Sequence, residues 1–448
     1  MMSETIAAVA TAHGIGSISI IRLSGPHALS IAKALTKKEN FTPRHAYLTP
    51  LYDADDELID EVITLYFKGP HSFTAEDVVE FQCHGGQMVA ENVLKAVLQE
   101  GARLAEPGEF SKRAFFNGRI DLTEAEAIAQ LIEAKSEDAA RILAKQMKGS
   151  LKHYVEDVRD QLLEILAYSE VTIDYAEEDL PEDLVQQIIL RLQTLHLNLS
   201  KTLSASEARR GLMQGFKVAI IGKPNVGKSS LLNALLNYNR AIVSEIAGTT
   251  RDTIEEQVKI GTHLIRIVDT AGIRESGDEI ELIGIERSIE AVEESDIVIA
   301  LFDGSREADT EDDAIISLIK AHENDRSFVL VVNKSDLVQQ FDAAAIEAYT
   351  PLRMSCKAET ISLIEQLKRL MDSQNVSDEM MLISLRQVEA VKETLQHIDD
   401  ANDPLKDQEL EIFSFHLNQA ILAIASITRP FEHDEMLDKM FGNFCLGK

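Results

Sequence analysis

The residues with the clearest chemistry form a glycine-rich loop between a short apolar run and a helical pattern. In FKVAIIGKPNVGKSSLLNALL, the spacing G-x-x-x-x-G-K-S runs from Gly222 to Ser229. Backbone N–H groups of such a loop, with the N-terminus of the following helix, bind phosphate oxygens. Lys228 would place a positive charge at the β- and γ-phosphates, and Ser229 would offer its hydroxyl to Mg²⁺. The loop predicts a nucleotide-phosphate site, the alternative being a chance glycine-rich turn.

Two further segments have residue types that suit a nucleoside triphosphate. LIRIVDTAG ends in Asp269 and Gly272, which fit a role at Mg²⁺ and a backbone contact to the γ-phosphate. Between this segment and the loop lies AGTTRDT, where Thr250 has the position of a switch threonine that ligates Mg²⁺. Both segments would therefore respond to the γ-phosphate.

The base-recognition residues follow in FVLVVNKSD and MSCKA. The Asp336 carboxylate can accept hydrogen bonds from guanine N1–H and N2–H₂, neither of which adenine offers, so ATP would leave it unpaired. Five such segments in this order predict a GTPase. The expected GTP contacts are Asn225, Val226, Gly227, Lys228, Ser229, Ser230, Ser244, Glu245, Ile246, Ala247, Gly248, Thr249, Thr250, Asp269, Thr270, Ala271, Gly272, Asn333, Lys334, Asp336, Ser355, Cys356 and Lys357.

Ile273 follows DTAG, where Ras-like enzymes have the glutamine that orients the attacking water. An isoleucine cannot orient water, so another polar group has to do so. The downstream sequence RESGDEIELIGIER offers Arg274, Glu275, Asp278, Glu279 and Glu281. Most of these are expected to be solvated loop charges, and at least one is expected to reach the site.

The composition limits the environment and the partners. The 448 residues have a 45% hydrophobic fraction and a formal net charge of −31. This acidity makes the chain a poor nucleic-acid binder by itself, unless it has a local basic patch or a basic partner, and solubility is the alternative explanation. Three scattered cysteines argue against a disulfide framework. With no signal peptide and no apolar run long enough for a membrane span, we expect a cytoplasmic protein.

The elements fall into an α/β plus α arrangement. Residues 1–118 contain the short β-branched runs ISIIRLSG, EVITLYFKG and EDVVEFQCHGG, each closed by glycine and expected to form a strand. They also contain the helix AENVLKAVLQEG, which Gly101 should end. From Thr123, which with Glu126 has the spacing of a capping box, helical patterns fill 119–214 and resume over 373–448. In 215–372 apolar strands alternate with helices, as in a parallel sheet. We predict a helical domain interrupted by an inserted Ras-like GTPase domain.

Motifs along the whole chain resemble the MnmE (TrmE) family of GTPases, which modify the wobble uridine of certain tRNAs. They are TAHGIGSISIIRLSG, FQCHGG, AEPGEFSKRAFFNGRIDLTEAEAI, TIDYAEEDL and the terminal FCLGK. Leu446 is within the range of the family's C-[IVL]-G-K ending. Where the family often has proline–proline–glycine–arginine near the start, this chain has AHGIG, so its first loop is expected to be built differently.

The resemblance implies an N-terminal domain that binds 5,10-methylene- or 5-formyl-tetrahydrofolate and forms a homodimer. Arg22, Glu80, Arg119 and Lys448 match the folate contacts; surface ion pairing is the alternative role. The resemblance also implies a partner, the FAD-containing MnmG (GidA), which would hold much of the tRNA. Together they would add an aminomethyl or carboxymethylaminomethyl group to C5 of the wobble uridine.

For hydrolysis, the resemblance implies a K⁺ ion in place of an arginine finger. Its ligands would be Asn225 and the backbone of Ser244, Ile246 and Thr249, while Ser229 and Thr250 would ligate Mg²⁺. Glu281 matches the family's catalytic glutamate, which would position water. GTP would bring two G domains together and hydrolysis would let them part.

Cys445 lies four residues from the C-terminus, and two roles remain open for it. It could be a thiol that assists catalysis beside Lys448, or a small apolar residue that seats the tail. A prenylation box does not fit, because Gly447 is not aliphatic. Two other functions compete with the main one: a ribosome-assembly or signalling GTPase with RNA-binding flanks, and a GTP-dependent scaffold.

Overall fold

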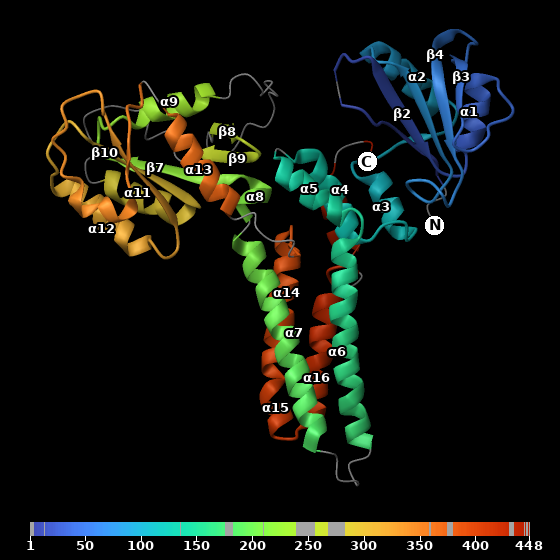
Figure 1. Cartoon of the computed structure of the whole chain (residues 1–448). Coiled ribbons are helices and arrows are strands. Elements are labelled where there is room, and N and C mark those ends of the chain that lie inside the picture. Colours follow the sequence, from blue (N-terminus) through green and yellow to red (C-terminus); the bar gives the residue numbers. More distant parts are fainter. Residues whose placement is uncertain are drawn as a thin grey trace. The chain divides into compact units, whose positions relative to one another are not determined.

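The computed structural model describes residues 4–12, 14–134, 136–174, 182–208, 210–238, 256–267, 283–357, 360–373, 380–429, 434–442, 444 and 447. The chain divides into two compact units, each with its own sheet (Figure 1). The first unit is Met1–Ile132, Lys145–Leu192 and Glu389–Lys448, and the second is Glu133–Ala144 and Gln193–Val388. Each unit is therefore assembled from segments far apart in the sequence.

The first unit has a six-stranded sheet in the order β3-β4-β5-β2-β1-β6. Neighbouring strands are antiparallel, except for the parallel pair β1 and β6. ISIIRLSG, EVITLYFKG and EDVVEFQCHGG were predicted to be strands and contribute β2, β4 and β5, which confirms the prediction. The strands are β1 (Ile6–Val9), β2 (Ile18–Ser24), β3 (Ala46–Tyr52), β4 (Leu58–Phe67), β5 (Val78–His84) and β6 (Arg103–Leu104).

Two amphipathic helices, α1 (Ala28–Thr36) and α2 (Gln87–Gln99), bury their apolar sides against this sheet. Their buried residues share one core with β2 and β5, including the fully buried Phe81. The predicted helix end at Gly101 is confirmed: α2 ends at Gln99, and Gly101 has a φ of 98°, which favours glycine.

Among the remaining helices of the first unit, α4 (Leu122–Glu133) begins with a different capping box from the predicted one. Asp121 Oδ1 accepts from the Glu124 backbone N–H, and Glu124 Oε2 accepts from the Asp121 N–H, at 2.9 and 2.8 Å. The box is therefore Asp121 with Glu124 rather than Thr123 with Glu126, because the Thr123 hydroxyl donates to Asp121 instead. These helices are α3 (Glu109–Phe116), α4 (Leu122–Glu133), α6 (Ser150–Asp174), α15 (Asn402–Lys406), α16 (Leu410–Ala425) and α17 (Asp434–Gly442).

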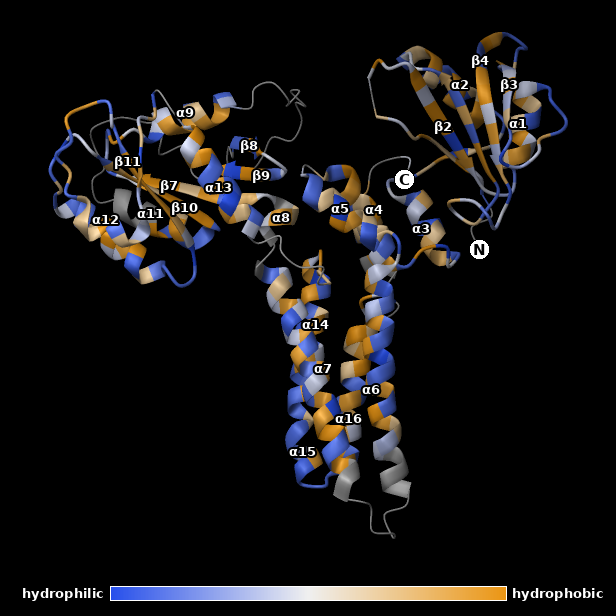
Figure 2. Ribbon diagram, in the orientation of Figure 1, coloured by the Kyte–Doolittle hydropathy of each residue, from blue (hydrophilic) through white to orange (hydrophobic). Residues whose placement is uncertain are grey.

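Helices α6 and α16 pack along each other, and apolar stripes are visible on both in Figure 2. Ser169 and Ser414 join them by a hydroxyl pair 3.0 Å apart. The division between the units falls within α5 (Glu137–Gln146), α7 (Glu182–Ala208) and α14 (Leu385–Asp400), and it also separates Glu133 from the rest of α4. Among the described helices, none has the length and apolarity needed to cross a membrane.

The second unit has a six-stranded sheet in the order β12-β11-β10-β7-β9-β8. Its strands are parallel except for β8 at one edge, which is antiparallel to β9. The central strand β10 is buried along its whole length, as expected when helices cover both faces of a parallel sheet. The strands are β7 (Phe216–Gly222), β8 (Glu256–Ile260), β9 (His263–Ile267), β10 (Ile297–Asp303), β11 (Ser327–Asn333) and β12 (Leu352–Arg353).

The helices of the second unit alternate with its strands. They are α8 (Arg210–Gln214), α9 (Lys228–Tyr238), α11 (Ile283–Glu294), α12 (Thr310–His322) and α13 (Ile361–Ser373), with short 3-10 turns at Ala343–Ala345 and Glu347–Tyr349. Two apolar cores lie on the two faces of the sheet: α9 and α13 contribute to one, and α11 and α12 to the other. The predicted α/β segment between helical segments is thus present, while the boundaries at 118, 214 and 372 stay predictions.

Candidate functional site

The glycine-rich loop joins the end of β7 to the start of α9, as its sequence predicts. Three of its residues have positive φ: Gly222 at 151°, Asn225 at 62° and Gly227 at 113°. A Cβ on Gly227 would lie 2.3 Å from Asn333 Nδ2, so only glycine fits this approach. The loop thereby turns its backbone around the start of α9, where N–H groups are available for phosphate.

Lys228 folds back over the loop. Its Nζ donates to the carbonyl oxygens of Gly222 at 2.5 Å and Lys223 at 3.1 Å. Burial lowers the pKa of Lys228 below that of a lysine in water. A phosphate anion placed here would favour the charged form, so the position suits anion binding.

The structure adds a support for the loop that sequence reasoning missed. Lys223 Nζ lies 2.7 Å from Asp309 Oδ2 and 2.6 Å from Asp312 Oδ2, at the start of α12. Burial would lower the pKa of Lys223, but these hydrogen bonds outweigh it and raise the pKa. Asp309 and Asp312 also form the capping box of α12, a sequence pattern that could have identified the pair.

Asn333 connects three loops at the end of β11. Its Nδ2 donates to the Val226 carbonyl at 2.7 Å, and its Oδ1 accepts from the Cys356 backbone N–H at 2.9 Å. The side chain is 3% exposed, so both contacts are inside the protein. Asn333 therefore braces the phosphate loop and the SCK segment through its side chain.

Lys334 follows with a φ of 63°, and its Nζ lies 2.6 Å from Asp303 Oδ2 at the end of β10. Burial alone would raise the pKa of Asp303, but hydrogen bonds from Lys334 and Ser305 outweigh it and lower the pKa. Asp303 was not predicted. Its position as the last residue of an apolar strand was the available signal, since the carboxyl ends of parallel strands share one edge.

The Asp336 carboxylate is exposed at this edge, and a hydrogen bond from Ser355 lowers its pKa. The Ser335 backbone N–H donates to the Met354 carbonyl at 3.2 Å, which ties the NKSD segment to the SCK segment. Lys357 is also exposed here. The structure thus brings the phosphate loop, NKSD and SCK together, with an ionised carboxylate available to a ligand.

The other predicted nucleotide and ion contacts lie outside the described residues. They are Ser244, Glu245, Ile246, Ala247, Gly248, Thr249, Thr250, Asp269, Thr270, Ala271, Gly272 and Glu281. Ser229 and Asn225 are described, and both are exposed on the loop.

Replacing Asn333 by Ala should weaken both the second unit and its nucleotide site. The Val226 carbonyl and the Cys356 N–H would each lose a buried partner, which costs about 1–3 kcal/mol apiece, so we expect unfolding to become easier by about 2–4 kcal/mol. Chemical denaturation with hydrogen exchange at β7 and β11 measures this. Asn237→Ala, an exposed change on α9, is the matched control. Equal stability of the two variants would show that the brace is unimportant.

A second set of predicted residues lies in the first unit. Arg22 and Glu80 face each other across β2 and β5, and Arg22 Nε donates to Glu80 Oε1 at 2.8 Å. The guanidinium also lies 5.6 Å from the Phe73 ring centroid and 3.4 Å from the Gly447 carbonyl oxygen. Gly447, near the end of the sequence, therefore reaches the β2–β5 pair.

Gly447 lies against the end of β1, where a Cβ would come within 2.5 Å of the Val9 carbonyl oxygen. Its φ of 89° also favours glycine. Arg119 is exposed and donates to the Ser72 carbonyl oxygen at 3.3 Å. Cys445 and Lys448 lie outside the described residues.

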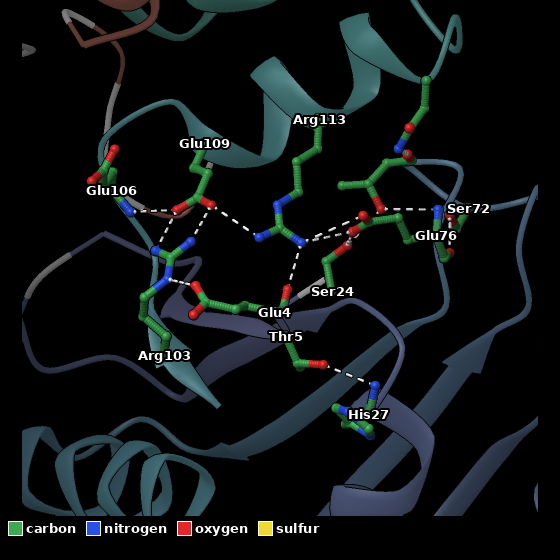
Figure 3. A network of polar contacts seen from close by, with 12 residues as sticks. Glu4, Thr5, Ser24, His27, Ser72, Glu76, Arg103, Glu106, Glu109 and Arg113 are labelled. Carbon is green, nitrogen blue, oxygen red and sulfur yellow. Dashed lines mark hydrogen bonds and ion pairs between the residues drawn. The ribbon is translucent and has the colours of Figure 1, made fainter. Parts of the chain in front are cut away.

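A buried ion-pair network next to this region was not predicted (Figure 3). Arg113 is 2% exposed and donates to Glu109 at 3.0 Å, to Glu76 at 3.1 Å and to the Glu4 carbonyl at 2.9 Å. Arg103 adds a second cation at 2.7 Å from Glu109. Burial would raise the pKa of Glu109, but these partners outweigh it and lower the pKa. The network fastens α3 to the segment just before β1 and to the loop before β5.

Two family models together match nearly the whole chain. The model described as the MnmE helical domain matches residues 122–445, and the one described as the GTP-binding protein TrmE N-terminus matches residues 5–119. A solved structure of an Aquifex aeolicus Era variant bound to GDP.AlF4- is 25% identical and covers 41% of this chain and 66% of that one. Its TM-score of 0.26 is too low to add support.

Full-length relatives agree with the family models. The tRNA modification GTPase MnmE of Sulfurimonas denitrificans is 69% identical over 448 residues, covering 100% of both chains. The protein of the same description from Sulfurovum sp. is 60% identical over 447 residues, covering 100% of this chain and 99% of its own. The chain belongs to the MnmE family of tRNA modification GTPases.

Proposed function

We propose that this chain hydrolyses GTP to drive modification of the wobble uridine of certain tRNAs. Acting with an FAD-containing partner of the MnmG (GidA) type, it would add an aminomethyl or carboxymethylaminomethyl group to C5. The observation that carries the proposal is the Asn333 brace, because it holds a phosphate loop beside the exposed Asp336 carboxylate. Membership of the tRNA modification GTPase family supports the rest.

Within this mechanism, the chain's own residues bind and orient the nucleotide. Lys228 exchanges its loop carbonyl contacts for the β- and γ-phosphates, while backbone N–H groups at the start of α9 bind phosphate oxygens. Asp336 accepts from the guanine edge. Glu281 orients the attacking water in place of the missing glutamine, and hydrolysis lets paired G domains of a homodimer part.

The residues at the loop fit two cations. Ser229 presents a hydroxyl at the start of α9, as Mg²⁺ sites of this kind require, with Thr250 as the second protein ligand. Asn225 exposes its amide on the loop and would hold K⁺ with the backbone of Ser244, Ile246 and Thr249. When bound, the two ions supply positive charge that stabilises the phosphate oxygens during transfer.

The decisive experiment is the modified-nucleoside profile of tRNA from cells that lack this chain. Loss of C5-modified wobble uridine, restored by the wild-type gene but not by a hydrolysis-deficient variant, is the expected result. An unchanged profile would favour the ribosome-assembly or signalling GTPase instead. Restoration by a variant that binds GTP without hydrolysing it would favour the scaffold.

The Arg22–Glu80 pair supports a tetrahydrofolate site in the first unit. An arginine can meet the glutamate carboxylate of folate, and a carboxylate can accept from the pterin N–H edge. Arg119 and Lys448 complete the proposed contacts, on 5,10-methylene- or 5-formyl-tetrahydrofolate. Gly447 beside Arg22 is consistent with Lys448 acting there.

Arg22→Met should weaken 5-formyl-tetrahydrofolate binding by about tenfold or more, because a charge-assisted hydrogen bond is lost. Fluorescence or calorimetric titration of the full chain measures it. Arg44→Met is the control, since Arg44 is an exposed arginine that donates to the His71 carbonyl. GTP hydrolysis should stay unchanged in both. Equal folate affinity in wild type and Arg22→Met would contradict the assignment.

Cys445→Ser should abolish tRNA modification and leave GTP hydrolysis and folate binding intact, if the thiol takes part in the chemistry. The other two cysteines are poor candidates, because burial raises the pKa of Cys83 and of Cys356 to about 11. Both should therefore be alkylated slowly at pH 8, whereas a Cys445 thiol that takes part in the chemistry should react faster. Full modification by Cys445→Ser would leave only a packing role.

A further inference from the structure

Two histidines and an aspartate lie close together on helices α14 and α16, and none of them belongs to the sites described above. His397 and Asp400 are three residues apart, so they lie on one side of α14. His416 comes from α16, and its ring centroid is 6.0 Å from that of His397. One ligand atom from each residue lies within 4.8 Å of the others.

The two imidazoles have unused polar atoms. Nδ1 of His397 and Nδ1 of His416 are buried, and neither finds a hydrogen-bond partner among the described residues. Burying a polar atom without a hydrogen-bond partner costs free energy, so native proteins rarely do it without a reason. A bound metal ion would provide that reason here. The Phe415 ring makes an edge contact with the His416 ring, with 5.4 Å between the ring centroids.

Asp400 contributes the charge. It is exposed, and one of its oxygens, Oδ1, accepts from Gln396 at 2.9 Å, which orients the carboxylate. Ligating carboxylates are commonly held by such a second partner. Two neutral imidazoles and one carboxylate form a set typical of Zn²⁺ and neighbouring divalent transition metals, with a position left for water.

We propose that His397, Asp400 and His416 bind a divalent transition-metal ion of the Zn²⁺ class, which clips the end of α14 to α16. Ligand atoms on a tetrahedral ion at 2.0–2.2 Å lie about 3.4 Å apart. The three ligand atoms here lie within 4.8 Å of one another, so binding requires them to approach by at most about 1.4 Å.

Titration of the metal-free, nucleotide-free full chain tests the proposal, with Zn²⁺ for affinity and Co²⁺ for its visible absorption. Excess Mg²⁺ should be present, because the net charge of −31 attracts cations unspecifically. We expect one tight site per chain. Removing a residue that only hydrogen-bonds to a metal ligand typically costs 10–100-fold in metal affinity. Loss of a direct ligand should cost at least as much, so His397→Gln or His416→Gln should weaken Zn²⁺ binding by about 100-fold or more.

The matched controls are His322→Gln on α12 and Asp407→Asn, an exposed carboxylate after α15. Both should keep wild-type affinity and the Co²⁺ spectrum, which His416→Gln should lose. Asp400→Asn changes an exposed residue, so it tests the site even if a histidine variant folds poorly, as judged by circular dichroism without metal. Equal metal binding by wild type, His416→Gln and Asp400→Asn would overturn the proposal.

Discussion

Asp336→Asn should reverse the nucleotide preference, lowering GTP affinity and raising affinity for XTP. The Asp336 carboxylate is exposed and ionised beside the phosphate loop, and its oxygens only accept hydrogen bonds. The asparagine oxygen can still accept from N1–H, but its NH₂ group would face the guanine N2–H₂, donor against donor, whereas it can donate to the 2-oxo group of xanthine. Because unmatched polar groups discriminate steeply, we expect the GTP-to-XTP affinity ratio to fall by about 10³-fold or more.

Competition titrations with GTP and XTP on the full chain measure this ratio. Asp325→Asn, an exposed aspartate in the turn after α12, is the matched control and should leave both affinities unchanged. Wild-type GTP affinity in Asp336→Asn would place base recognition elsewhere. Equal loss of GTP and XTP binding would instead indicate collapse of the site, which far-UV circular dichroism and Asn333 hydrogen exchange would reveal.

The second large effect concerns the cation in the assay. The proposed K⁺ ion, with Asn225 as one ligand, takes the place of an arginine finger and stabilises the charge on the γ-phosphate. An arginine finger in this role is worth about 10³–10⁵ in rate, so replacing K⁺ by Na⁺ should slow hydrolysis by about 10³-fold or more. Single-turnover hydrolysis in matched chloride buffers measures the rate.

Asn225 permits a precise comparison because its φ is 62°. Asn225→Gly keeps this backbone conformation and removes the amide, so it should lose the K⁺ stimulation while still binding GTP. Asn225→Asp keeps an oxygen ligand and should retain much of the stimulation. Equal rates in Na⁺ and K⁺ for the wild type, or unchanged stimulation in Asn225→Gly, would contradict the assignment.

The sequence alone predicted the features that depend on neighbouring residues. The spacing from Gly222 to Ser229 between a strand and a helix predicted the phosphate loop, which joins β7 to α9. Short β-branched runs closed by glycine predicted β2, β4 and β5, because the preference of such residues for strands acts within a few consecutive positions. The motifs also identified the family. Local spacing was less reliable at the start of α4, where Asp121 and Glu124 form the capping box instead of Thr123 and Glu126.

Only the tertiary structure decided which distant side chains meet. Asn333 braces Val226 and Cys356, Lys223 pairs with Asp309 and Asp312, and Lys334 pairs with Asp303. These contacts depend on the order and register of parallel strands, which chain spacing does not encode. The same holds for His397 and His416, whose meeting requires α14 and α16 to pack at one particular rotation. Short-range patterns specify elements, whereas contacts between elements arise when burial of their apolar faces sets their relative position.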